Sequence, residues 1–286
     1  MAAEGKVIVI TGSNAGIGRE TAKELNLQGG MILMLCRSQE RAEAAIARLI
    51  QEGCDASRLR FYECDLANFA SVRACAELVI KDFDHIDILI NNAGIAFYPR
   101  HELTVDGHEL TWQSNHLSHF LLTQLLLPLL QKAPRARIIF ASPLDLSIID
   151  SKEIFSVLYH PYARSKLANI MTSRELSKRL GDIEGNQITV NSLDPGSVAT
   201  EISKNMPVFG IAGFMRPIYK LFLKTEKRGA ATSIYCAISP EVKGATGGYY
   251  DCDSKKKPES RHALDEEKCR ELYEYSMRTV GLTEQK

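Results

Sequence analysis

Residues 7–20, VIVITGSNAGIGRE, join an apolar run to a glycine-rich turn and the start of an amphipathic segment. Gly12 permits a tight turn, and Gly16 and Gly18 let the backbone approach a ligand and neighbouring elements closely. Free N–H groups and the helix dipole favour a pyrophosphate at such a helix start. We therefore interpret the stretch as a first strand, a phosphate-binding turn and a first helix. The alternative is a tight strand–helix turn that holds no ligand.

Apolar runs and helix-length segments alternate along the rest of the chain. The runs predict strands at residues 6–11, 30–36, 58–64, 86–91, 137–142, 187–193 and 248–250. The segments predict helices at residues 17–28, 38–52, 69–83, 112–131, 162–180, 227–238 and 265–280. The runs lack alternation of apolar and polar residues, as in strands covered on both faces. We predict an α/β fold: a single doubly wound Rossmann-type domain over residues 1–286, whose seven-stranded, mainly parallel sheet carries helices on both faces.

Charge and cysteine content exclude several classes of partner. The 286 residues contain 35 Lys and Arg against 35 Asp and Glu, and this neutral balance disfavours a nucleic-acid partner. The seven cysteines are scattered without a CxxC motif, which indicates reduced thiols and no metal site. The first residues lead directly into a strand, so we expect no signal peptide, and residues 120–130 are too short an apolar run to span a membrane. These features favour a cytoplasmic protein.

Four motifs in chain order resemble those of the short-chain dehydrogenase/reductase family. They are TGSNAGIG at residues 11–18, NNAG at residues 91–94, Tyr162-x-x-x-Lys166, and Pro195-Gly196. The stretches CRSQERAEAAI, NHLSHFLLTQLLLPLL and RSKLANIMTSREL resemble the retinol-dehydrogenase-like branch of that family. The resemblance implies an oxidoreductase that moves a hydride between a nicotinamide cofactor and an alcohol or carbonyl compound.

By this resemblance, a set of residues distributed along the chain binds the cofactor. Asp65 is expected to receive the adenine amino group, although it could instead cap the following helix. The segment at residues 91–94 is expected to pass over the cofactor ribose, although Asn91 could simply stabilise the sheet. The full expected set is Gly12, Ser13, Asn14, Gly16, Ile17, Gly18, Arg37, Asp65, Leu66, Asn91, Ala93, Gly94, Tyr162, Lys166, Pro195, Gly196, Val198 and Thr200.

The end of the second predicted strand favours NADP(H) over NAD(H). NAD enzymes usually carry an acidic residue there for the ribose 2′-hydroxyl, whereas this chain has Cys36 followed by Arg37. A guanidinium can make bidentate contacts with a 2′-phosphate. Ser13 and Arg19 are candidate supporting contacts. The alternative is that Arg37 is a solvated residue at the start of a helix.

Tyr162 and Lys166 are four residues apart in a predicted helix and therefore lie on one face. A free tyrosine has a pKa of about 10, and a nearby ammonium lowers it toward neutrality. Tyr162 could then exchange a proton with the substrate oxygen. The resemblance adds Asn115, which would hold a water that connects the lysine to solvent; a packing role is the alternative. We expect His116 and His119 to be core or helix-surface residues, because no third metal ligand accompanies them.

The catalytic serine of the branch is missing from its usual position. An ungapped match places Pro143 there, a residue that has neither a hydroxyl nor an N–H group. Ser142 could replace the serine if the strand end shifts by one residue, and Ser147 is a weaker candidate. The sequence thus leaves open a slow enzyme, a displaced serine, or a nucleotide-binding scaffold that has lost catalysis.

The region after Pro195 resembles the part of the family that contacts nicotinamide and substrate. Asp194 stands where the branch often has histidine, and residues 201–226 would form the substrate lid. The apolar content of this lid suits a lipophilic aldehyde, ketone or alcohol such as a retinoid; covering the core or a subunit interface is the alternative. Two further hypotheses are peripheral membrane contact through residues 202–224 and a homodimer.

Overall fold

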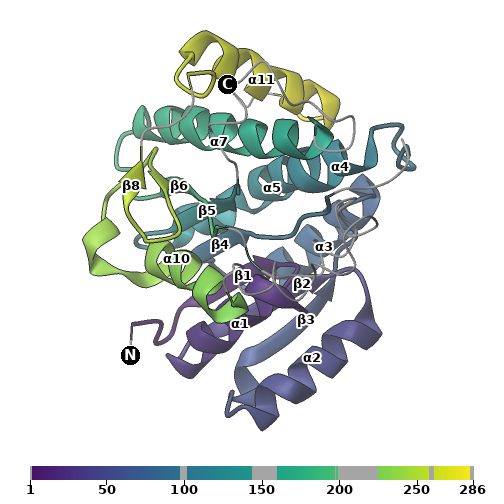
Figure 1. Ribbon diagram of the computed structural model, residues 1–286, viewed down its shortest axis with the longest axis vertical. Coiled ribbons are helices and arrows are strands. Elements are labelled where there is room, and N and C mark those ends of the chain that lie inside the picture. Colours follow the sequence, from purple (N-terminus) through teal and green to yellow (C-terminus); the bar gives the residue numbers. More distant parts are fainter. Residues whose placement is uncertain are drawn as a thin grey trace, which may run out of the picture.

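An eight-stranded sheet forms the centre of the protein, in the strand order β3-β2-β1-β4-β5-β6-β7-β8 (Figure 1). The computed structural model describes residues 2–96, 102–143, 160–196, 198, 225–257 and 261–283. The strands are β1 (Val7–Thr11), β2 (Met31–Cys36), β3 (Leu59–Glu63), β4 (Ile88–Asn91), β5 (Arg137–Ala141), β6 (Thr189–Leu193), β7 (Tyr249–Tyr250) and β8 (Lys256–Lys257). Strands β1 to β7 pair in parallel with their neighbours, and β8 pairs antiparallel with β7.

Helices cover both faces of this sheet, as predicted. The longer helices are α1 (Gly16–Leu27), α2 (Gln39–Gln51), α3 (Phe69–Asp82), α5 (Ser118–Lys132), α7 (His160–Gly181), α10 (Glu226–Ile238) and α11 (Glu266–Thr279). One hydrophobic core lies between the sheet and α3, α5 and α7, and a second lies between the sheet and α1, α2 and α10. Figure 1 shows the layers, with the C-terminal helix α11 outside α7.

Single strands supply both cores. In β1, Val7 and Val9 belong to the first core, while Ile8 and Ile10 belong to the second. Successive side chains of a strand point to opposite faces, so a strand buried on both faces must be apolar throughout. This requirement explains why the unbroken apolar runs of the sequence predict the parallel strands.

The prediction of seven strands was wrong by one. Lys256 and Lys257 form the eighth strand, in a run of three lysines where no strand is predicted. Both lysine side chains are exposed, and their backbone pairs with Tyr250 and Tyr249. An edge strand protected by lysines carries no hydrophobic pattern, so its sequence resembles a turn.

The single helix predicted at residues 112–131 is built from three pieces. A short helix α4 (Leu110–Trp112) runs into a π-turn at Gln113–Leu117 and then into α5. All five residues of the π-turn are buried. Turns of this kind occur mostly as single insertions in α-helices and are frequent at functional sites.

The C-terminal helix, predicted at residues 265–280, packs against α7 and α5. Asp265 caps its start by accepting a hydrogen bond of 3.2 Å from the N–H of Lys268. Tyr273 is buried, with its ring edge-to-face against Phe120 at 4.9 Å between centroids. Arg179 lies over the Tyr273 ring at 4.3 Å. The last helix is thus part of the first core.

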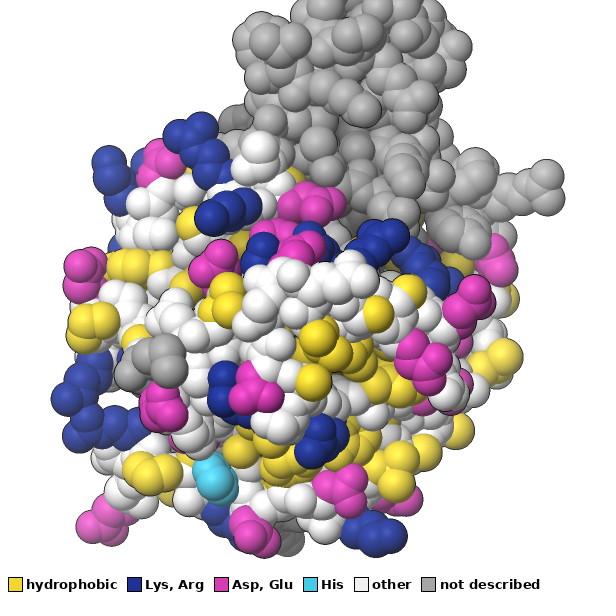
Figure 2. All heavy atoms as spheres, turned by 90° about the horizontal axis from the view of Figure 1, so that it is seen from below, with side chains coloured by type: hydrophobic (Ala, Val, Ile, Leu, Met, Phe, Trp, Pro, Cys, Tyr) yellow, Lys and Arg dark blue, Asp and Glu magenta, His cyan; other side chains and the backbone are white. Residues whose placement is uncertain are grey.

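The described surface is of mixed charge. On the face in Figure 2, basic and acidic side chains are interspersed across the coloured part of the molecule. Among the described residues, no helix is long and apolar enough to cross a membrane.

Candidate active site

The glycine turn packs directly against the segment that follows β4. Gly12 has a φ of +65°, and a Cβ there would lie 2.9 Å from the Cβ of Ala93. A Cβ on Gly18 would lie 2.5 Å from both the Asn92 Nδ2 atom and the Gly12 carbonyl oxygen. Neither contact can be relieved, because backbone or a packed neighbour stands in the way. Glycine at these two positions therefore lets the turn and the 92–95 segment come together.

Helix α1 begins without a side-chain cap. Its N-cap residue is Ala15, which offers no hydrogen-bond acceptor, and its first turn contains no acidic residue. The backbone N–H groups at the start of a helix need a partner from elsewhere. This helix start, next to the glycine turn, is suited to an anion.

A cavity of about 390 Å³ lies at the carboxyl ends of the parallel strands. Parallel α/β sheets commonly bind ligands at this edge. The predicted site residues that line the cavity are Gly12, Asn14, Gly16, Ile17, Gly18, Arg37, Asp65, Leu66, Ala93, Gly94, Tyr162, Lys166 and Pro195. The structure therefore gathers four motifs, spread over more than half of the chain, around one space.

Other predicted residues are placed beside the cavity and do not line it. The Ser13 hydroxyl donates to the carbonyl oxygen of Ile10 at 3.1 Å, and the Asn91 carboxamide donates to Thr123 Oγ1 at 3.0 Å. The Gly196 N–H donates to Asp194 Oδ1 at 2.7 Å, and Val198 is buried. Thr200, Ser147, the lid at residues 201–226 and its membrane-contact part at 202–224 fall outside the described residues, apart from residues 225 and 226.

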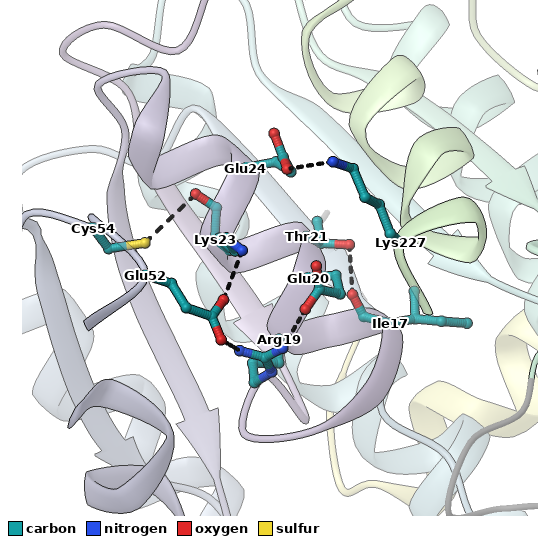
Figure 3. Close-up of polar contacts among 9 residues, drawn as sticks. All are labelled: Ile17, Arg19, Glu20, Thr21, Lys23, Glu24, Glu52, Cys54 and Lys227. Carbon is teal, nitrogen blue, oxygen red and sulfur yellow. Dashed lines mark hydrogen bonds and ion pairs between the residues drawn. The ribbon is translucent and has the colours of Figure 1, made fainter. Parts of the chain in front are cut away.

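Arg19 is held away from the cavity by acidic partners. Its guanidinium pairs with Glu20 and, at 2.9 Å, with Glu52 at the end of α2 (Figure 3). Lys23 binds the same Glu52 carboxylate at 2.7 Å, and its hydrogen bond lowers the pKa of Glu52. Arg19 thus belongs to an ion-pair cluster that joins α1 to α2.

One end of the cavity is basic. Arg37, Ser38 and Arg41 line it after β2, together with the buried Cys36. The Ser38 hydroxyl caps α2 by accepting a 3.3 Å hydrogen bond from the Arg41 N–H, which places Arg41 in the first helical turn. Asp65 is the single acidic residue among the cavity-lining residues that the structure describes. The sequence interpretation missed Ser38 and Arg41, although the spacing of Arg37 and Arg41 is a detectable signal.

Asp65 does not cap the next helix. Its Oδ1 atom accepts a 3.0 Å hydrogen bond from the Ala67 N–H, while Asn68 caps α3. The Asp65 side chain is half-buried and lines the cavity. The helix-capping role is therefore wrong, and contact with the adenine amino group stays a prediction.

Tyr162 and Lys166 enter the cavity from α7. The Lys166 Nζ atom lies 5.6 Å from the centroid of the Tyr162 ring and donates a 3.0 Å hydrogen bond to the Ala141 carbonyl oxygen. Burial lowers the pKa of Lys166 from 10.5 to about 8. The Ser165 hydroxyl donates to the carbonyl oxygen of Tyr162 at 2.7 Å. A buried ammonium is therefore fixed beside the tyrosine.

At the end of β5, the cavity wall contains Pro143 and excludes Ser142. Ala141 and Pro143 line the cavity, and the residue between them on an extended chain points to the opposite side. The Ser142 N–H continues the β5–β6 pairing through a 2.7 Å hydrogen bond to Leu193. The Ser142 hydroxyl is fully buried and, among the described residues, has no hydrogen-bond partner. This geometry gives no support to a displaced catalytic serine at Ser142.

Asn115 lies in the π-turn and joins two parts of the site. Its Oδ1 atom accepts from the Ile95 N–H at 2.8 Å, and its Nδ2 atom donates to the Ile95 carbonyl at 2.9 Å. The same Nδ2 atom donates to Ser165 Oγ on α7 at 3.0 Å. Asn115 therefore ties the segment after β4 to the helix of Tyr162, and its part in a proton relay stays a prediction.

The two histidines are core residues with full hydrogen bonding. His116 lies between Asn169, at 3.1 Å, and Ser276 of α11, at 3.0 Å. His119 lies between Thr11, at 2.9 Å, and the Asn115 carbonyl oxygen, also at 2.9 Å. Within the described part of the chain, no cluster of His, Cys, Asp or Glu could hold a metal ion.

Comparisons with known proteins identify the class. The short chain dehydrogenase family profile matches residues 6–208. Mouse retinol dehydrogenase 14 (Mus musculus) is 39% identical, the alignment covering 97% of this chain and 86% of the relative. Retinol dehydrogenase 13 from Homo sapiens is 37% identical, the alignment covering 97% of this chain and 85% of the relative.

Solved structures share the fold. A short chain dehydrogenase from Shigella flexneri, complexed with NADP, has a TM-score of 0.70 at 22% identity, with 88% of this chain and 98% of that chain covered. A 3-ketoacyl-(acyl-carrier-protein) reductase from Brucella melitensis, complexed with NADH, has a TM-score of 0.69 at 22% identity. The match covers 87% of this chain and 96% of that chain. The fold and the gathered motifs define a nicotinamide-dependent oxidoreductase class. This chain belongs to the short-chain dehydrogenase/reductase family and is retinol-dehydrogenase-like within it.

Proposed function

We propose that this protein is an NADP(H)-dependent oxidoreductase that interconverts a lipophilic alcohol and its aldehyde or ketone, with a retinoid as the leading substrate class. The observation that carries the proposal is the meeting of Tyr162 and Lys166 with the glycine turn in one cavity. Retinol dehydrogenases 13 and 14, the similar relatives, favour a retinoid. The apolar composition of residues 201–226 agrees with a lipophilic substrate.

Several features of the cavity fit a nicotinamide dinucleotide. The uncapped start of α1, next to the glycine turn, would hold its pyrophosphate, because its backbone N–H groups have no side-chain cap. The adenosine end would lie by Asp65, and the nicotinamide end by Tyr162, Lys166 and Pro195. When bound, the cofactor supplies or accepts the hydride.

Arg37 and Arg41 support a preference for NADP(H). Two guanidinium groups at the basic end of the cavity match the charge of a 2′-phosphate. Cys36 stands where a carboxylate would repel that phosphate, and burial raises the pKa of its thiol, so the thiol is uncharged. The charge at this end of the cavity thus favours the phosphorylated cofactor.

Tyr162 is the proton donor and acceptor in this proposal. During reduction, its hydroxyl gives a proton to the substrate oxygen while the carbonyl carbon gains the hydride; oxidation reverses both transfers. The Lys166 ammonium stabilises the tyrosinate that results. Because Pro143 replaces the serine, one hydrogen-bond donor to the substrate oxygen is missing, and comparable losses cost about 10²–10³-fold in rate. We therefore expect a slow enzyme.

A nucleotide-binding protein without catalysis is the second candidate, and Pro143 in the cavity wall is the observation that favours it. Hydride transfer with retinal and simple aldehydes, measured with NADPH and with NADH, separates the two. The first proposal expects NADPH-dependent turnover that Tyr162→Phe lowers by at least about 100-fold without weakening NADPH binding. NADPH binding without turnover across the panel would support the scaffold.

Location and assembly complete the proposal. A cytoplasmic protein that touches a membrane through residues 202–224 would meet its lipophilic substrate there. Flotation with anionic vesicles tests that contact. A homodimer stays a prediction that sedimentation in solution can test.

A further inference from the structure

Two groups hold the segment at residues 92–95, which lines the cavity. At its start, the Thr11 Oγ1 atom accepts hydrogen bonds from the N–H groups of Asn92 and Ala93, both at 2.9 Å. At its end, the Asn115 carboxamide bonds both backbone groups of Ile95, at 2.8 and 2.9 Å. The backbone between these contacts includes Gly94, where a Cβ would lie 3.2 Å from the Lys166 Nζ atom.

His119 contacts both of these holding residues. Its Nε2 atom lies 2.9 Å from Thr11 Oγ1, and its Nδ1 atom lies 2.9 Å from the Asn115 carbonyl oxygen. The imidazole is fully buried in the first turn of α5. One side chain thus bridges strand β1 and the π-turn, which are about a hundred residues apart in sequence.

Hydrogen-bond chemistry allows one arrangement of protons here. A carbonyl oxygen only accepts, so Nδ1 carries the hydrogen and donates to Asn115. Burial lowers the pKa of His119 to about 3, so the ring is neutral and Nε2 is an acceptor. Thr11 Oγ1 already accepts from two N–H groups, which leaves its own hydrogen for Nε2. Every polar atom of the bridge is satisfied.

We propose that His119 is a positioning residue of this site: by joining Thr11 to the Asn115 backbone, it fixes the 92–95 segment against the bound nucleotide. The part of the test that measures NADPH affinity rests on the proposed function. His119 touches neither cofactor nor substrate, since it does not line the cavity.

His116 provides the contrast. It is equally buried in the same helical stretch, but its ring bonds Asn169 of α7 and Ser276 of α11, and it reaches the Asn115 carbonyl oxygen through the Asn169 amide, which donates to that oxygen at 2.9 Å. If His119 only stabilised the fold, removing it and removing the His116–Ser276 contact should have the same effects. The variant Ser276→Ala therefore serves as a control at the far side of His116, since it removes the contacts of the Ser276 hydroxyl with His116 and with the Leu272 carbonyl oxygen.

The test uses His119→Phe, His119→Gln and His119→Asn in the full chain. Gln keeps an amide near the Nε2 position facing Thr11, and Asn keeps one near the Nδ1 position facing Asn115. Hydrogen exchange of the peptide 91–96 in the nucleotide-free protein is the first readout, and the Kd of NADPH is the second. Thermal unfolding of each variant measures its general cost in stability.

We expect His119→Phe to speed exchange in the peptide 91–96 and to raise the Kd of NADPH, each by about tenfold, as for the loss of a buried hydrogen bond. His119→Gln should restore the exchange rate and the Kd of NADPH more fully than His119→Asn does. Ser276→Ala should lower the melting temperature and leave the exchange rate and the Kd unchanged. Unchanged exchange in His119→Phe, or an equal change in Ser276→Ala, would overturn the proposal. If His119→Phe does not fold, the Gln and Asn variants decide by the same criteria. A wild-type protein that binds no nucleotide would contradict the proposed function, and the exchange comparison would still decide the role of His119.

Discussion

The Lys166 ammonium is buried against the carbonyl oxygen of Ala141, with 3.0 Å between Nζ and the oxygen. Desolvation lowers the pKa of Lys166 from 10.5 to about 8. Between those two pH values, the unfolded chain binds a proton that the folded chain has released. The contribution of this group to the free energy of unfolding therefore rises with pH across that window.

The variant Lys166→Met removes this linkage. Wild-type protein should gain about 2 kcal/mol relative to the variant between pH 7 and pH 10, from a single proton with the shift given above. Urea unfolding of both proteins at several pH values measures the difference. Parallel stability profiles would show that the lysine is not desolvated in the folded protein.

Restoring the missing hydroxyl should raise activity. Pro143 lines the cavity, so Pro143→Ser would place a donor on the side of Tyr162. We expect kcat/KM for retinal to rise by about 10-fold or more, a part of the cost of a lost oxyanion donor. Ser142→Ala is the control and should leave kcat/KM unchanged, because Ser142 is buried and does not line the cavity. Loss of activity in Ser142→Ala would instead assign catalysis to that serine.

Cofactor choice should depend on both arginines at the basic end of the cavity. Arg37→Gln and Arg41→Gln should each raise the KM for NADPH by about tenfold, as for loss of one charge-assisted phosphate contact, with little change for NADH. Arg48→Gln, an exposed change on the same helix that does not line the cavity, is the control. Equal effects on NADPH and NADH would refute 2′-phosphate recognition.

Acid should destabilise the protein through its buried histidines. Burial lowers the pKa of His116 to about 4 and of His119 to about 3, from 6.5. Below pH 6.5 the two histidines bind protons in the unfolded chain but stay neutral in the folded core. The free energy of unfolding therefore falls as the pH falls. From pH 7 to pH 5 the two histidines together should cost about 3–4 kcal/mol.

Denaturant midpoints at the two pH values check this expectation. His116→Gln should remove about half of the histidine-linked loss, because one of the two uncharged rings is gone. A variant with the full wild-type pH dependence would mean that His116 is protonated in the folded protein.

The sequence predicts the parallel sheet well because burial on both faces leaves uninterrupted apolar runs such as residues 31–36. The glycine turn is equally recognisable, since Gly12 and Gly18 have no sterically possible substitute. Strand β8 was missed because two exposed lysines pair only through their backbone. The side chains of Ser142 and Pro143 could not be assigned to a face until the end of β5 was known.

The hydrogen bonds around His119 could not be predicted from the sequence for a different reason. Thr11 and His119 bond across 108 positions, and nothing in the sequence links the last residue of the first strand to a helix histidine. Local patterns predict which elements form, while contacts between elements depend on how they pack. The roles of Thr11 and His119 became visible only with the packed elements in place.

The π-turn at Gln113–Leu117 changes the helical phase between α4 and α5. Leu110 before it and Ser114 within it line the cavity, while Leu122, Leu126 and Leu129 beyond it fill the first core. If these five residues took up the ordinary helical repeat at unchanged chain length, everything downstream would rotate by about 100°, the step of one residue. The leucine face would then turn out of the core, so the wide turn sets the register between the cavity-lining part and the core-forming part of one continuous helix.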